Sequence, residues 1–136
     1  MKLSGDVRER VQRRARGACE YCHIPQDASI LPHQVDHHII GKQHRGSDDP
    51  ANLCLCCIRC NLKKGPNIAS IDRETDLVVG LYHPRRHSWQ EHFAISAEGI
   101  LQGLTAEARS TVQLLDMNDE DRVRLRVLLL RRGRYT

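Results

Sequence analysis

Residues 34–65 read QVDHHIIGKQHRGSDDPANLCLCCIRCNLKKG, and they hold most of the chemically active side chains of this chain. They include two adjacent histidines, a lone asparagine, a Cys-x-x-Cys pair and a Cys-Asn step. A second Cys-x-x-Cys pair precedes them. Two residues between thiolates let both sulfurs reach one ion from a tight turn, and two such pairs complete a tetrahedral structural site. The sequence therefore predicts that one structural zinc ion is bound by Cys19, Cys22, Cys57 and Cys60.

The other two cysteines fall outside this spacing. Cys54 and Cys56 lie just before the second pair and are expected to be small buried residues. Six cysteines would also suit three disulfides in a secreted protein, which is the main alternative. No N-terminal stretch has the pattern of a signal peptide, so metal binding and a cytoplasmic location are favoured.

The composition limits what the chain can be. Of its 136 residues 40% are hydrophobic and 4% aromatic, so the core is thin and the cysteine-rich half is expected to need metal to fold. The net charge of +4 suits a polyanionic partner without establishing one. No apolar run approaches the length of a membrane span, so no membrane partner is expected.

The N-terminal half has the pattern of a helix, two short strands and a second helix. Residues 4–18 place apolar side chains at helical spacing, with four arginines on the opposite face. Branched side chains predict a strand over residues 34–40, and a second apolar run predicts another over residues 53–57. A short helix is expected over residues 58–64, where Gly65-Pro66 ends it.

The C-terminal half has weaker strand patterns. Residues 67–74 are expected to be irregular and residues 77–82 to form a strand. Residues 93–95 and 99–101 are expected to pair as a hairpin.

Two helices are expected after that hairpin. Thr105 can cap the first, which would run to about Met117. Asn118 or Asp119 can cap the second, which would run to about Arg132. Their apolar residues are expected to cover the strands, and a remaining apolar stripe would support a homodimer.

The order of these motifs resembles that of the HNH endonucleases of the ββα-metal type. In that family a strand ends in acidic-His-hydrophobic-hydrophobic, and a His-Gly-Gly-like step, Asn-Leu and Cys-x-x-Cys-Asn-x-x-Lys-Gly follow. This chain carries His37-His38-Ile39-Ile40, His44-Arg45-Gly46, Asn52-Leu53 and Cys57-Ile58-Arg59-Cys60-Asn61-Leu62-Lys63-Lys64-Gly65. Further tracts, His83-Pro84-Arg85-Arg86 and Trp89-Gln90-Glu91-His92-Phe93, resemble a bacterial subfamily with a C-terminal extension.

The resemblance implies hydrolysis of phosphodiester bonds in DNA with a divalent catalytic metal, Mg²⁺, Mn²⁺, Ni²⁺ or Zn²⁺. It makes His38 the general base, a role that suits a side chain with a pKa near neutrality. It makes Asn61 a ligand of the catalytic metal, which offsets charge on the scissile phosphate. Asn52 would hold the loop so that His38 points correctly.

One residue departs from the family pattern. The residue before the base is normally acidic and binds the metal, whereas here it is His37. A neutral ligand weakens the attraction of hard Mg²⁺ and favours Mn²⁺, Ni²⁺ or Zn²⁺. An alternative register makes Asp36 the ligand and His37 the base. Because alternate strand residues share a face, Asp36 could also assist the metal in the favoured register.

Four side chains are candidates for contact with the DNA backbone. Arg59, Lys63 and Lys64 lie on the helix that carries Asn61, and His44 lies in the preceding loop. The alternative to a nuclease is a zinc-dependent DNA-binding module without cleavage activity, which the missing acid before His38 favours.

The expected architecture is α+β. It consists of a zinc-clamped ββα-metal core with an N-terminal helix, followed by a C-terminal β-hairpin and two helices. We expect residues 1–66 to form the zinc-bound nuclease core with its N-terminal helix. Residues 67–136 are expected to form a β/α extension that lies against the core within one structural domain.

Overall fold

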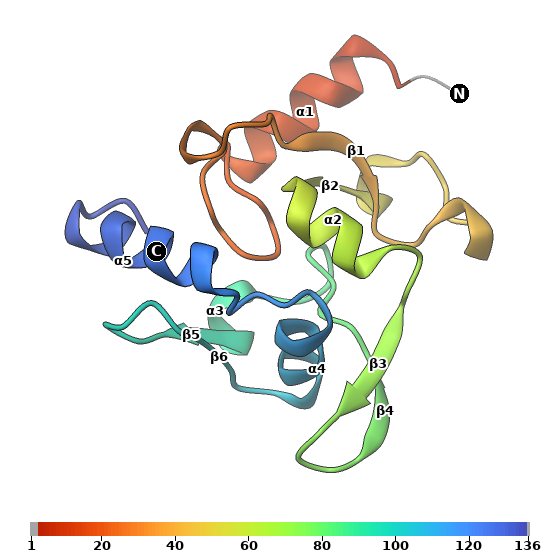
Figure 1. Ribbon diagram of the computed structural model, residues 1–136. Coiled ribbons are helices and arrows are strands. Elements are labelled where there is room, and N and C mark those ends of the chain that lie inside the picture. The colour runs from red at the N-terminus through yellow and green to blue at the C-terminus, as the bar shows by residue number, and fades with distance from the viewer. Residues whose placement is uncertain (1–2, 136) are drawn as a thin grey trace. The chain divides into compact units, whose positions relative to one another are not determined.

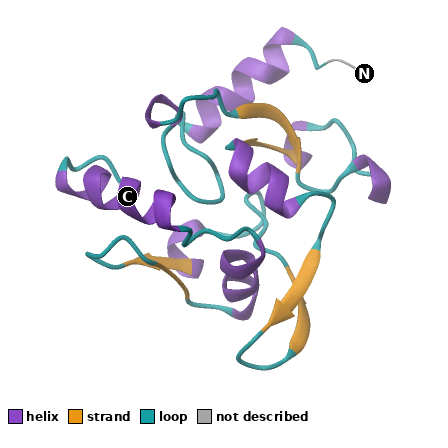
Figure 2. Cartoon of the chain, viewed as in Figure 1, coloured by secondary structure: helices purple, strands orange, loops and turns teal. Residues whose placement is uncertain are grey.

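The computed structural model describes residues 3–135, which divide into two compact units at the junction of Asn67 and Ile68. Each unit mixes α-helices with two-stranded antiparallel sheets (Figures 1 and 2). The predicted α+β class is confirmed. Among the described residues, no helix has the length and apolar character needed to span a membrane.

The N-terminal unit is built from two helices and one hairpin. Its elements are α1 (Gly5–Ala15), β1 (Gln34–His38), β2 (Leu53–Cys56) and α2 (Ile58–Lys64). The Ser4 side chain accepts a hydrogen bond from the Val7 amide and so starts α1. The helix ends earlier than the predicted Ala18, because Arg16 adopts a left-handed conformation with φ of 54°.

A small apolar core holds α1 against the β1–β2 hairpin. Val11, Val35, Leu53 and Leu55 are buried there, with Leu3, Val7 and Ala15 packed around them. The hairpin register slips by one residue between Gln34 and His37, which is a β-bulge in β1. Bulges redirect side chains and are common beside active sites. Here the bulge directly precedes the paired histidines.

The C-terminal unit contains two hairpins and three helices. The first hairpin pairs β3 (Ala69–Asp72) with β4 (Leu77–Gly80), so the prediction that residues 67–74 are irregular is wrong over β3. The second pairs β5 (Phe93–Ile95) with β6 (Leu101–Gly103). The β5 strand has its predicted bounds, and β6 lies two residues later than predicted. The helices are α3 (Trp89–His92), α4 (Ala106–Leu114) and α5 (Glu120–Arg131).

Capping residues start the last two helices as predicted. Thr105 accepts a hydrogen bond from the Ala108 amide, and Asp119 accepts one from the Arg122 amide. The strands do not form the single sheet that the two helices were expected to cover. Instead, α4 contacts both hairpins through β3, β4 and β6.

A buried arginine helps to fix the turn between α4 and α5, in which Leu115 and Met117 are also fully buried. The Arg126 side chain is fully buried and donates hydrogen bonds to the carbonyls of Gly99 and Met117. It also donates to Asn118 Oδ1. The same oxygen accepts a hydrogen bond from the Leu101 amide, and Asn118 Nδ2 donates to the Leu101 carbonyl. This network replaces part of the apolar contact that the sequence predicts for α5.

An ion pair between the buried Asp72 and the partly exposed Arg109 joins β3 to α4 and makes the stability of this unit pH-dependent. Arg109 donates two hydrogen bonds of 2.9 Å to the buried Asp72 carboxylate and holds its pKa well below the usual range. A depressed folded-state pKa stabilises the fold above the unfolded-state pKa of about 4, and that contribution is lost as the pH falls below it. We expect the melting temperature to fall as the pH drops from 5 to 3, and to fall less in Asp72→Asn.

Candidate active site

The four cysteines of the two Cys-x-x-Cys pairs converge on one point. The sulfurs of Cys19, Cys22, Cys57 and Cys60 all lie within 4.8 Å of one another. The Cys22 and Cys57 sulfurs are 3.7 Å apart. A tetrahedral zinc site with Zn–S bonds of about 2.3 Å places its sulfurs about 3.8 Å apart. The cluster can therefore hold a metal such as zinc.

The chemistry of these thiols fits a metal site better than disulfides. All six cysteines are free and buried. Burial raises the pKa of the Cys19 and Cys60 thiols well above their usual range, so these groups ionise only when a cation compensates the charge. Cys54 and Cys56, which lie outside the cluster of four, are buried as predicted.

The β1 strand and α2 bring an imidazole and a carboxamide together. His37 Nδ1 lies 2.8 Å from Asn61 Oδ1, and the Asn61 amide donates a 2.5 Å hydrogen bond to Gln34 Oε1. This second bond assigns the carboxamide oxygen to the side that faces His37. The other ring nitrogen of His37, Nε2, lies 3.1 Å from the Tyr21 hydroxyl.

This pair has the properties of a metal-binding site. Burial lowers the pKa of His37 to about 4, so the imidazole is neutral at pH 7, as a ligand must be. Two ligands of one divalent ion with bonds of about 2.1 Å stand about 3 Å apart, close to the observed separation of His37 Nδ1 and Asn61 Oδ1. Both side chains line a surface pocket, together with Asp36 and His38.

His38 has a partner that the sequence does not reveal. Its Nε2 lies 2.7 Å from Asp48 Oδ1, and the same oxygen receives an ion pair from Lys42 Nζ at 2.6 Å. Hydrogen bonds from Lys42 and His38 lower the pKa of the Asp48 carboxyl. Asp48 is one of two adjacent aspartates in a turn, and no spacing rule distinguishes it from Asp49.

Asn52 fastens the loop between the two strands. Its amide donates to the carbonyls of Ile40 and Ser47, both at 2.9 Å, and its Oδ1 accepts from the Ile40 amide at 2.8 Å. At Gly46 the loop leaves no room for a side chain, since an added Cβ would lie 1.6 Å from the Ile40 carbonyl oxygen. The two ends of the loop that carries Asp48 are therefore fixed.

The candidate DNA contacts divide into exposed and buried groups. Arg59 and Lys63 are exposed on α2, and the exposed His44 lies 3.0 Å from the Pro66 carbonyl through its Nε2. Lys64 does not fit the prediction that it contacts the DNA backbone. Its side chain is 2% exposed and donates a hydrogen bond to the Ile39 carbonyl at 2.9 Å. The helical periodicity that turns Lys63 outward turns Lys64 toward β1.

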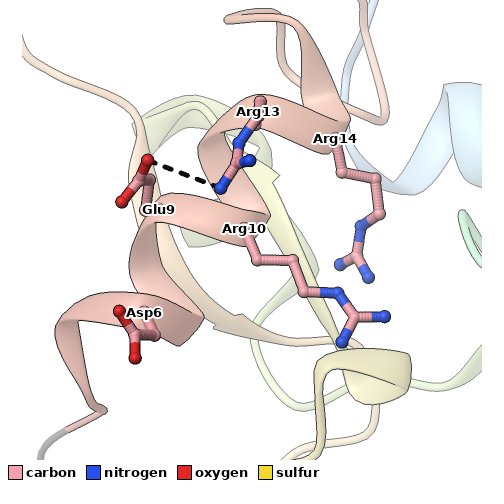
Figure 3. A pocket seen from close by; sticks show the side chains of 5 residues that line it. All are labelled: Asp6, Glu9, Arg10, Arg13 and Arg14. Carbon is pink, nitrogen blue, oxygen red and sulfur yellow. Dashed lines mark ion pairs between the residues drawn. The ribbon is translucent and has the colours of Figure 1, made fainter.

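A second surface hollow lies on α1 and is lined by charged side chains (Figure 3). Glu9 pairs with Arg13 across one turn at 3.4 Å. Arg14 turns inward and donates a 2.7 Å hydrogen bond to the Leu53 carbonyl, which ties α1 to β2. Arg10 is exposed on the same hollow and is available to a partner.

The clamp, the hairpin and the helix together define a domain of the cysteine-clamped ββα-metal class. Residues 19–67 match the family model described as HNH endonuclease, in agreement with the resemblance that the motif order carries. Members of that family are generally nucleases. The matched segment ends where the C-terminal unit begins. No curated protein and no solved structure matches the chain.

Proposed function

We propose that this protein is a metal-dependent endonuclease that hydrolyses phosphodiester bonds in DNA. The observation that carries the proposal is the 2.8 Å approach of His37 Nδ1 to Asn61 Oδ1 in a pocket that His38 also lines. An ion held there would offset the charge of the scissile phosphate and of the leaving oxygen. The four cysteines would hold a separate, structural zinc ion.

In this proposal His38 is the general base. Its Nε2 is engaged by Asp48, so Nδ1 is the nitrogen that would take a proton from the attacking water. The Asp48 carboxylate orients the ring and stabilises the imidazolium that forms. Asn52 contributes by fixing the loop on which Asp48 stands.

The ligand set favours softer ions over Mg²⁺. His37 and Asn61 are both neutral, and the exposed Asp36 lines the same pocket. The imidazole ligand suits Mn²⁺, Ni²⁺ or Zn²⁺ better than it suits Mg²⁺. Under the alternative register, with Asp36 as ligand and His37 as base, Mg²⁺ would support the higher activity.

Backbone phosphates are the proposed contacts of Arg59, Lys63 and His44, with Arg10 of α1 as a further candidate. Such contacts carry no base specificity, and their affinity falls steeply with salt. The homodimer expected from the apolar C-terminal helices stays a prediction, as does the arrangement of the two units as one structural domain.

Plasmid nicking tests the proposed function. We expect the wild type to convert supercoiled DNA to the open circle with Mn²⁺ or Ni²⁺, and more slowly with Mg²⁺. Asn61→Ala should need a metal concentration raised by 10-fold or more, on the order of the loss expected for a weakened ligand set. Asn67→Ala, a change at an exposed asparagine just beyond α2, is the matched control.

A DNA-binding module without cleavage is the second candidate, because a histidine replaces the acid before His38. Binding of DNA without nicking in any of these metals would favour it and would contradict the nuclease.

A further inference from the structure

The first cysteine knuckle contains a tyrosine that reaches the candidate catalytic site. Tyr21 lies between Cys19 and Cys22 and is fully buried. Its ring meets the His37 ring edge-on, with centroids 5.4 Å apart and planes at 89°. Its hydroxyl is 3.1 Å from His37 Nε2. One side chain therefore links the four-cysteine cluster to the histidine–asparagine pair.

The fully buried Cys54 thiol lies near the Tyr21 hydroxyl. A phenolic hydroxyl both donates and accepts, and a thiol does the same more weakly. Tyr21 can thus donate to His37 or accept from it. The hydrogen bond between the two side chains can form in either direction.

The direction of the Tyr21–His37 hydrogen bond determines which nitrogen of His37 carries the proton. If Tyr21 donates to Nε2, the proton of the neutral ring is on Nδ1 and is shared with Asn61 Oδ1. If Tyr21 accepts, the proton is on Nε2, and the Nδ1 lone pair and Asn61 Oδ1 both face the pocket without a hydrogen between them. Two such acceptors 2.8 Å apart repel each other unless a cation lies between them.

We propose that Tyr21 is a positioning residue that fixes His37 with Nδ1 as its metal-binding nitrogen. The inference rests on the proposed function, because it concerns the same divalent ion. The ring keeps one proton in both states: on metal binding Nδ1 gives its proton to solvent and Nε2 takes one from solvent. Tyr21 keeps its own proton, and only the direction of its hydrogen bond to His37 reverses.

The first cysteine pair therefore has a second role beyond stabilising the fold. The chain turn that places Cys19 and Cys22 on one metal also places the hydroxyl between them on His37. A neighbour of this kind, which holds the far nitrogen of a ligating imidazole, changes metal affinity by about 10–100-fold when it is removed. Binding at the second site is therefore tied to the integrity of the first.

Calorimetric titration of Mn²⁺ into the full chain, loaded with one zinc ion, tests the inference. Tyr21→Phe removes only the hydroxyl, and we expect its Mn²⁺ affinity to fall by about 10–100-fold while the bound zinc stays at one ion per chain. Tyr82→Phe, the same change at a buried tyrosine of the C-terminal unit, should leave the Mn²⁺ affinity unchanged. Equal affinities of the wild type and Tyr21→Phe would overturn the inference.

Nitrogen-15 spectra of the His37 ring provide the second measurement and use the unaltered protein. With one equivalent of Zn²⁺ added beyond the structural ion, we expect a proton on Nε2 and a metal-shifted Nδ1. A metal-shifted Nε2 overturns the inference even if Tyr21→Phe does not fold. If the wild type binds no second ion, the metal site of the proposed function fails, and the inference fails with it. If it binds and Tyr21→Phe binds equally, only the inference fails.

Discussion

Removing the metal from the four-cysteine cluster is expected to unfold the N-terminal unit. The buried aliphatic cluster of that unit is small, consisting of Val11, Val35, Leu53 and Leu55. Structural zinc contributes on the order of 10–16 kcal/mol at pH 7 in small zinc domains, which is at least comparable to the whole stability of a typical domain, about 5–15 kcal/mol. Without it, four buried thiols would face one another without the ion that joins the two knuckles.

The measurement is a chelator titration followed by amide spectra and by tryptophan emission. The single tryptophan, Trp89, is buried in the C-terminal unit and reports on that unit alone. We expect the amide dispersion of residues 3–67 to collapse at the midpoint of zinc loss. Trp89 emission should stay blue-shifted at that point, because the C-terminal unit has its own buried residues.

A matched pair of variants separates the metal from general damage to the core. Cys60→Ser removes one ligand and should abolish stoichiometric zinc. Cys56→Ser makes the same change at a buried cysteine outside the cluster, where its sulfur donates to the Cys57 carbonyl, a bond that serine can reproduce. A chelated protein that kept its N-terminal amide dispersion would show that the cluster does not stabilise the fold.

His38→Ala is expected to lower the rate of DNA cleavage by about 10²–10⁴-fold, the range found for loss of a general base. DNA affinity in a non-cleaving buffer should stay close to that of the wild type. The half-buried His38 side chain contacts Asp48, whereas the proposed phosphate contacts are made by other, exposed basic residues. Single-turnover nicking and a binding isotherm measure the two quantities separately. His92→Ala, in the C-terminal unit, is the control substitution.

The same assay distinguishes the two possible registers. If His37 is a ligand, excess Mn²⁺ should partly restore His37→Ala but leave His38→Ala inactive, since added metal compensates for a weakened site and not for a lost base. Rescue of His38→Ala and failure to rescue His37→Ala would reverse the assignment. Asp48→Asn keeps the shape of the side chain but removes its charge, and a reduced rate there would support the role given to the carboxylate.

The local elements were predictable because short-range rules govern them. The α2 helix has the predicted limits, since Gly65-Pro66 stops it, and Thr105 and Asp119 cap the helices that they were expected to cap. The β3 strand was missed because its four residues, Ala-Ser-Ile-Asp, form a short run with a single branched apolar side chain. The pairing with β4 and the Asp72–Arg109 contact stabilise it. Both contacts come from other parts of the chain.

The amino-acid sequence alone determined the ligand types and their spacing. Two Cys-x-x-Cys pairs, adjacent histidines and a Cys-Asn step set the chemistry, because metal binding depends on which atoms a short turn can present. Only the tertiary structure decided which neighbours tune those atoms. Contacts between different segments place Tyr21 against His37, Asp48 against His38 and Lys64 in the interior. No local pattern encodes the direction in which a folded chain turns each side chain.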